Sequence, residues 1–136
     1  MTRQVIRTAR TTDVESIRLL MKSVPGFWDD NWRPDVLERA LISADDLAIV
    51  SPSGDAIEGF ICAHDLGFRA YVSELIVSPS AQGMGIGSEL LSEVDRRLAA
   101  RGCAVAIADV WRDAEGFYRA QGWSPPSVVL LRKHTT

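Results

Sequence analysis

Residues 74–91 read Glu-Leu-Ile-Val-Ser-Pro-Ser-Ala-Gln-Gly-Met-Gly-Ile-Gly-Ser-Glu-Leu-Leu. This stretch joins a short apolar run, a proline, three glycines at alternate positions and the start of a helical pattern. A strand that passes directly into a glycine-rich helix start exposes backbone N–H groups, which carry partial positive charge from the helix dipole. Because such a cluster suits a phosphate or diphosphate, the stretch predicts that the chain binds a phosphorylated cofactor.

Two well-known phosphate loops do not match this glycine turn. A P-loop needs a lysine before the Ser or Thr that opens the helix, but Gly87 precedes Ser88. A dinucleotide-binding fingerprint needs a glycine three positions after Gly85, where this chain has Ser88. A purely structural interpretation stays open at this stage, in which the glycines only let the helix pack closely on the strand before it.

Composition narrows the class of protein. The chain has 136 residues, of which 46% are hydrophobic and 24% charged, as expected for one globular domain spanning residues 1–136. A formal net charge of −3 argues against a nucleic-acid partner. Without a signal peptide or a run of membrane-spanning length, we expect a cytoplasmic protein with no membrane partner. Cys62 and Cys103 lie in apolar runs, which favours buried thiols, and no metal-ligand spacing is present.

Hydrophobic periodicity predicts alternating strands and helices. We expect strands over residues 4–8, 47–51, 57–65, 70–77, 104–110 and 128–133, and helices over 13–23, 35–43, 85–101 and 114–121. The third helix has one apolar stripe, at Ile86, Leu90, Val94 and Leu98. This order predicts an α/β (α+β) fold in which an antiparallel meander is followed by a βαβ crossover.

Two motifs resemble those of the GNAT family of N-acetyltransferases. The apolar strand 75–77 followed by Gln-x-x-Gly-x-Gly at residues 82–87 resembles the family's Arg/Gln-x-x-Gly-x-Gly/Ala. Residues 114–123, Ala-x-x-Phe-Tyr-x-x-x-Gly-Trp, resemble its second motif, and the expected element order is similar across almost the whole chain. The resemblance implies a mixed central sheet with helices on both faces, in which strands 70–77 and 104–110 splay apart at the cofactor cleft.

The resemblance implies acetyl-CoA as the cosubstrate. Backbone groups of Leu75, Ile76 and Val77 would pair with the pantetheine arm. The pyrophosphate would lie on the main chain of the glycine turn, which comprises Gln82, Gly83, Met84, Gly85, Ile86, Gly87 and Ser88. A glycine is suited to this contact because a Cβ atom would hold the phosphates away from the amides.

Two residues are candidates for proton transfer. Tyr118 matches the family position whose hydroxyl lies near the thioester sulfur, and a phenol with a pKa of about 10 suits a thiolate leaving group. Glu74 is the candidate base. By strand alternation we expect it on the face of Val72 and Ile76, where desolvation would raise the pKa of its carboxyl. Structural roles, a packed tyrosine and a salt-bridged carboxylate, stay open.

The resemblance also leads to candidates in the cofactor arm and the acceptor pocket. Trp111 stands where the family usually has Asn, and its ring would pack on pantetheine or adenine instead of accepting a hydrogen bond. The loop at residues 26–32 would line the acceptor pocket. There Trp28, Asp29 and Asp30 combine an aromatic ring with carboxylates, which suits a cationic amine. The alternative is that the aromatic rings cap the core while the carboxylates face water.

These observations favour an N-acetyltransferase that moves an acetyl group from acetyl-CoA to a primary amine by direct attack in a ternary complex. Neither cysteine matches a nucleophile position. The acceptor is a small-molecule amine or a peptide amine, and the oligomeric state stays open between a monomer and a homodimer. Two alternatives remain: a non-catalytic CoA sensor or interaction module on the same fold, and a different nucleotide at the glycine turn.

Overall fold

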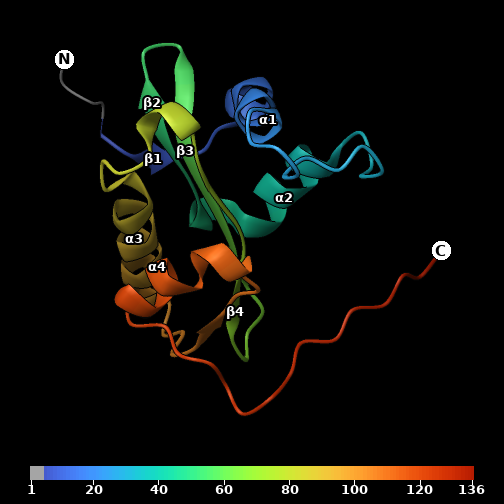
Figure 1. The fold of residues 1–136 in the computed structure, drawn as a ribbon, viewed down its shortest axis with the longest axis vertical. Helices are drawn as coiled ribbons and strands as arrows, with labels where there is room; N and C mark the ends of the chain where they lie inside the picture. The colour runs from blue at the N-terminus through green and yellow to red at the C-terminus, as the bar shows by residue number, and fades with distance from the viewer. Residues whose placement is uncertain (1–4) are drawn as a thin grey trace.

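A computed structural model describes residues 5–136 of the chain. Figure 1 shows one sheet with α1 and α2 on one side of it and α3 on the other. The strands are β1 (Arg7–Thr8), β2 (Ala48–Ser53), β3 (Ala56–Asp65), β4 (Ala70–Val77) and β5 (Ala106–Ile107). The helices are α1 (Val14–Lys22), α2 (Val36–Ala44), α3 (Ile86–Ala100) and α4 (Glu115–Ala120). Short 3₁₀ turns precede α1 and α4, follow α2 and lie between β4 and α3.

The sheet is mixed, as the sequence predicted. Its strand order is β1-β2-β3-β4-β5, the first four strands are antiparallel neighbours, and β4 and β5 are parallel. The crossover from β4 to β5 passes through α3, which covers the second face of the sheet. Helices therefore lie on both faces of an antiparallel meander that ends in one parallel pair.

The core lies between β3 and the helices on either side. Ile86, Leu90, Val94 and Leu98 are all buried, which confirms the apolar stripe predicted for α3. The helix starts very close to the sheet because β3 has Gly59 opposite it. A Cβ atom at this glycine would approach Ile86 Cγ2 to 2.6 Å. This contact sets the height of the α3 N-terminus above the strands.

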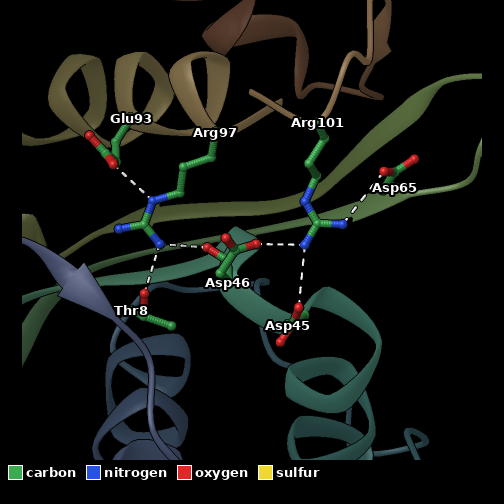
Figure 2. A network of polar contacts seen from close by, with 7 residues as sticks. All are labelled: Thr8, Asp45, Asp46, Asp65, Glu93, Arg97 and Arg101. Atoms are coloured by element: carbon green, nitrogen blue, oxygen red, sulfur yellow. Dashed lines mark hydrogen bonds and ion pairs between the residues drawn. The ribbon is translucent and has the colours of Figure 1, made fainter. Parts of the chain in front are cut away.

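A group of paired charges, which we call the arginine network, holds the other end of α3 (Figure 2). Its members are Thr8, Asp45, Asp46, Asp65, Glu93, Arg97 and Arg101. Arg97 donates to the Asp46 carbonyl at 2.6 Å and to Thr8 Oγ1 at 2.7 Å. Arg101 donates to the Asp46 carboxylate at 2.6 Å. The network thereby joins α3 to the turn between α2 and β2 and to β1.

The C-terminal third departs from the sequence prediction. A strand was expected over residues 104–110, but only Ala106–Ile107 pairs with β4. The strand expected over residues 128–133 is wrong: the segment has no regular structure, and Val128, Val129, Leu130 and Leu131 are exposed. A strand needs a ladder partner for its backbone groups, and the chain runs away from the sheet here (Figure 1). In the described chain no residue after Leu98 is buried.

The remaining elements differ from the prediction by a few residues at their ends. The first strand was expected at residues 4–8, and of these Gln4 lies outside the described residues. None of the helices in the described part of the chain is both long and apolar enough to cross a bilayer.

Candidate active site

A β-bulge at Ser73 shapes the middle of β4. Cys62 on β3 pairs with Glu74, but the next residue, Ala63, pairs with Val72, so Ser73 has no partner in this ladder. Paired residues share a face of the sheet and consecutive residues do not. Glu74 therefore lies with Cys62 on the α1–α2 face, whereas Val72 lies on the α3 face. The expectation that Glu74 shares a face with Val72 was wrong because a bulge shifts the alternation.

The bulge coincides with the point where β4 and β5 separate. Their pairing comprises Ala70 with Ala106 and Tyr71 with Ile107, and it ends before Ser73. No described strand pairs with the outer edge of β4 over residues 75–77. This edge offers backbone donors and acceptors to an extended ligand. It belongs to the residues predicted from the family resemblance to meet the pantetheine arm.

The glycine turn leads from this edge into α3. Gly83 and Gly85 have φ angles of 83° and 82°, in the left-handed region that glycine adopts most easily. A Cβ atom at either glycine would meet nothing within 4 Å, so the turn is open on its outer side. The first backbone N–H groups of α3 have no partner within the helix. This arrangement fits a pyrophosphate held by main-chain donors.

The other residues of the turn have different surroundings. Gly87 allows close packing, since a Cβ atom there would approach Phe117 Cζ to 3.1 Å. The Ile86 side chain is buried in the core, so only its backbone can meet a ligand, whereas Met84 is exposed. Gln82 donates from Nε2 to the Val77 carbonyl at 3.3 Å, which ties the turn to the end of β4.

Glu74 lines a cavity of about 130 Å³ between the sheet and the first two helices. The other lining residues are Met21, Trp32, Val36, Leu37, Ala40, Phe60 and Cys62. No described residue forms an ion pair or a hydrogen bond with its carboxylate. Burial, and secondarily the charge of Asp109, raise the pKa of Glu74 from 4.5 to about 7. A carboxyl with this pKa can hold or release a proton near neutral pH.

Tyr118 packs between Phe117 and Trp123, with ring centroids 5.5 Å apart in each edge-to-face pair. Burial raises its pKa to about 12, and the charges of Asp109 and Glu74 act in the same direction. The phenol is therefore protonated at neutral pH and lies within electrostatic range of both carboxylates. The charge of Glu74 therefore acts on Tyr118, the other residue predicted for proton transfer.

Sequence reasoning missed a second tyrosine–carboxylate pair beside them. The Tyr71 hydroxyl donates to Asp109 Oδ1, joining β4 to the segment after β5. Burial, followed by the hydrogen bond to Asp109, raises the pKa of Tyr71. Asp109 follows the carboxyl end of β5, where α/β folds place their ligands, and that position was the available signal. The contact itself depends on cross-strand geometry that sequence periodicity does not contain.

A short polar chain lies next to Glu74 on the same face. His64 Nδ1 is 2.8 Å from Ser43 Oγ, and His64 Nε2 is 3.0 Å from Ser73 Oγ. Burial lowers the pKa of His64. The thiol of Cys62 lies 3.6 Å from His64 Nε2, and burial raises its pKa to about 12. This thiol is held protonated, which disfavours it as a nucleophile.

None of the three loop residues predicted for the acceptor pocket, Trp28, Asp29 and Asp30, lines the cavity. Trp28 packs edge-to-face on Trp32 at 5.2 Å, and Lys22 Nζ lies 5.3 Å from the Trp28 ring centroid. Asp29 and Asp30 are exposed and do not line the cavity. Of this loop, Trp32 is the residue that reaches the cavity wall.

Trp111 contacts the same loop through Phe27. Its ring centroid is 5.7 Å from that of Phe27, and 52% of the residue is exposed. The indole therefore has a free surface at the start of the segment that carries α4. Its predicted contact with the cofactor stays a prediction.

Comparison with known proteins identifies the family of the chain. The family model described as "Acetyltransferase (GNAT) family" matches residues 14–123. An acetyltransferase of Pectobacterium atrosepticum is 32% identical over 134 residues, with 94% of this chain and 93% of the relative covered. An acetyltransferase of Yersinia enterocolitica is 28% identical, with coverage of 94% and 93%.

Solved structures agree on the fold. The aminoglycoside N-acetyltransferase AAC(6')-Iy, crystallised with CoA, superposes with a TM-score of 0.76 at 21% identity, covering 100% of this chain and 98% of that protein. Ard1 from Thermoplasma volcanium gives a TM-score of 0.77 at 16% identity, with coverage of 90% and 84%. At these identities the likeness establishes the architecture alone.

Proposed function

Because the chain belongs to the acetyltransferase (GNAT) family, we propose that it transfers an acetyl group from acetyl-CoA to a primary amine by direct attack in a ternary complex. The observation that carries the proposal is the unpaired Glu74 carboxylate, which lies where β4 leaves β5 and has a pKa of about 7. A base is needed at this place because an amine attacks a thioester only in its neutral form.

The glycine turn and the free edge of β4 would hold the cosubstrate. Open left-handed backbone at Gly83 and Gly85 supports a pyrophosphate site, and the edge at residues 75–77 supports pairing with the amides of the pantetheine arm. The arm would then run along β4 toward Glu74. Acetyl-CoA supplies the activated acetyl group, and the residues of the cleft would accept and donate the protons of the reaction.

Glu74 would remove the proton from the incoming ammonium, directly or through a water molecule. Its pKa of about 7 leaves a large fraction ionised at neutral pH. The new N–C bond forms on the acetyl carbonyl as the C–S bond breaks. Tyr118 would then donate its phenolic proton to the departing thiolate sulfur, since its pKa of about 12 keeps the proton in place until that moment. The phenolate would take up the second proton, which the nitrogen releases as it becomes an amide.

Direct attack is favoured over a covalent acetyl-enzyme by the state of the cleft cysteine. Cys62 is buried, and its pKa of about 12 leaves almost no thiolate at neutral pH. The other cysteine, Cys103, does not line the cavity.

Steady-state measurement of thiol release from acetyl-CoA with a panel of primary amines tests the function. Glu74→Gln should abolish the acidic limb of the kcat/KM profile near pH 7. Tyr118→Phe should lower kcat while leaving CoA affinity unchanged. Glu38→Gln, on the exposed side of α2, is the matched control and should behave as the unaltered protein. Tight CoA binding without transfer to any amine would instead favour the CoA-sensing module.

We propose a homodimer as the assembled form and the cytoplasm as its location. Four consecutive apolar residues, Val128, Val129, Leu130 and Leu131, are exposed on the C-terminal segment, and contiguous apolar surface favours self-association. Light scattering should give twice the monomer mass for the full chain. A monomer mass at micromolar concentration would contradict the dimer.

A further inference from the structure

The cavity beside Glu74 is lined mostly by apolar side chains. Of its eight lining residues, six have apolar side chains: Met21, Trp32, Val36, Leu37, Ala40 and Phe60. The two remaining groups are the Cys62 thiol and the Glu74 carboxylate. The thiol already has a polar neighbour in His64. The Glu74 carboxylate is therefore the one charged group in the lining of a largely apolar cavity.

The Glu74 carboxylate can pair with one cationic group of a ligand, and the cavity lining offers no second carboxylate. A buried carboxylate without an ion pair or hydrogen bond is destabilised, and an ammonium at the cavity mouth would supply both. Further hydroxyl or ammonium groups carried into the chamber would find no acceptor on its walls. They would lose their water and gain nothing in return. The lining thus selects against polyhydroxylated and polycationic groups inside the cavity.

The volume sets the size of the group that enters. The cavity of about 130 Å³ is slightly smaller than an apolar protein cavity of about 150 Å³ that binds benzene. A phenyl ring or a branched four- or five-carbon chain therefore fills it. Trp32 and Phe60 offer ring faces or edges to such a group.

We propose that the acceptor is a primary amine carrying one compact apolar group, which enters this cavity while the ammonium meets Glu74. This inference rests on the proposed acetyl transfer and names its substrate class. Free arylalkylamines or branched alkylamines satisfy the chemistry. So does the N-terminal residue of a peptide when its side chain is apolar. The assay below separates these two sources.

The test compares kcat/KM for five acceptors with acetyl-CoA in excess: ethylamine, 3-methylbutylamine, 2-phenylethylamine, spermidine and kanamycin. We expect the two apolar amines to exceed ethylamine, spermidine and kanamycin by at least about tenfold, because one methylene in an apolar pocket already discriminates by about 10- to 200-fold. A preference for spermidine or kanamycin would overturn the inference while leaving acetyl transfer intact. Phenylalanylglycine amide, compared with 2-phenylethylamine, identifies a peptide or a free amine as the better source.

A substitution that fills the cavity tests whether the preference for apolar amines arises there. Ala40 lies on α2 in the cavity wall, and Ala40→Leu adds three carbons there. We expect at least about a tenfold loss with 2-phenylethylamine and little change with ethylamine. Ala100→Leu, at an exposed position of α3, is the matched control. If Ala40→Leu fails to fold, Val36→Ala enlarges the same wall and should shift the preference toward bulkier amines. An unchanged ratio between the two amines in the folded variant would refute the cavity assignment.

Binding without catalysis separates this inference from the proposed function. In the absence of acetyl-CoA, millimolar 2-phenylethylamine should raise the thermal midpoint more than spermidine does, and Ala40→Leu should remove the difference. This result would support the cavity even if no amine were acetylated. An equal or larger shift with spermidine would count against it.

Discussion

The two ends of α3 differ in how their charged groups are paired. The arginine network lies at the C-terminal end of the helix, and the cleft lies at its N-terminal end. Arg97 and Arg101 make five hydrogen bonds or ion pairs to Thr8, Asp45, Asp46 and Asp65, besides the Arg97–Glu93 pair. In the cleft, no described residue pairs with the Glu74 carboxylate, and the turn there consists of glycines that are open on their outer side. Paired charges serve stability, whereas unpaired groups remain available to ligands.

The largest effect should follow from closing the glycine turn. Gly85→Glu places a Cβ and a negative charge at a φ of 82° in front of the main-chain donors. We expect CoA affinity to fall at least about hundredfold by calorimetry, because backbone strain and charge repulsion act together.

Gly67→Glu is the control for this change, because Gly67 has a φ of 84° in the β3–β4 turn and faces open space. Gly67→Glu should be about as stable as Gly85→Glu but should bind CoA with the affinity of the unaltered protein. Equal CoA affinity in both variants would show that the turn does not bind the cosubstrate.

Removing the unpaired charge should stabilise the protein. The pKa of Glu74 is about 7 in the folded state against an ordinary 4.5, so the folded state binds more protons within that window. The effect of Glu74 on the free energy of unfolding is therefore close to zero below about pH 4.5. Between pH 4.5 and 7 it lowers the free energy of unfolding progressively, by about 3 kcal/mol in total. We expect Glu74→Gln to raise the free energy of unfolding by about this amount at pH 8.5 and by little at pH 4.5.

Urea denaturation at both pH values checks this prediction, with Glu38→Gln as the exposed control. A stability gain that is the same at both pH values would mean that the carboxylate charge is not the cause.

Breaking the arginine network should have the opposite sign. Arg97→Met removes hydrogen bonds to the Asp46 carbonyl and Thr8. We expect a loss of about 1–3 kcal/mol in the free energy of unfolding, with CoA affinity nearly unchanged. Arg39→Met is the control, because Arg39 is exposed and its side chain pairs, within residues 5–136, with Asp35 alone. This i,i+4 pair contributes about 0.5 kcal/mol or less. If Arg97→Met changed the free energy of CoA binding as much as the free energy of unfolding, the network and the cleft would be coupled rather than independent.

The smallest effect concerns strain within the network. Asp45 has a φ of 56°, the one positive value among non-glycine residues in the described chain. Its ion pair with Arg101 is long, at 3.4 Å. Asp45→Gly should therefore stabilise the fold by about 0.5–1 kcal/mol, measured by thermal unfolding. Asp55→Gly, at ordinary φ, should destabilise it slightly, and a loss in both variants would show that the Asp45–Arg101 pair outweighs the strain.

The scaffold was largely predictable from the sequence because its elements have strong periodicity. Strand β4 has the predicted bounds, and α3 differs by one residue at each end. The shortfall at β5 and at residues 128–133 has a common cause: apolar composition predicts extended chain, but a strand forms only where a neighbour completes its hydrogen bonds.

The candidate site was likewise predictable only in part from the sequence. Spacing was sufficient for the glycine turn and for Tyr118, because motifs are local in sequence. The pairing of Tyr71 with Asp109 and the wall formed by α2 residues such as Ala40 depend on how distant segments meet. The bulge at Ser73 leaves no mark in the alternation of β4, so the face of Val72 was assigned wrongly.

The bulged residue Ser73, which has no partner in the β3–β4 ladder, has an evolutionary implication. Losing its codon would leave Val72 and Glu74 on their present faces, since they already sit opposite adjacent residues of β3. We expect β4 to straighten, however, and its pairing with β5 to extend beyond Tyr71, because a bulge bends the strand that carries it. A three-nucleotide deletion would then cover the edge of β4 proposed to bind the cosubstrate, and we expect a folded relative without acetyl transfer.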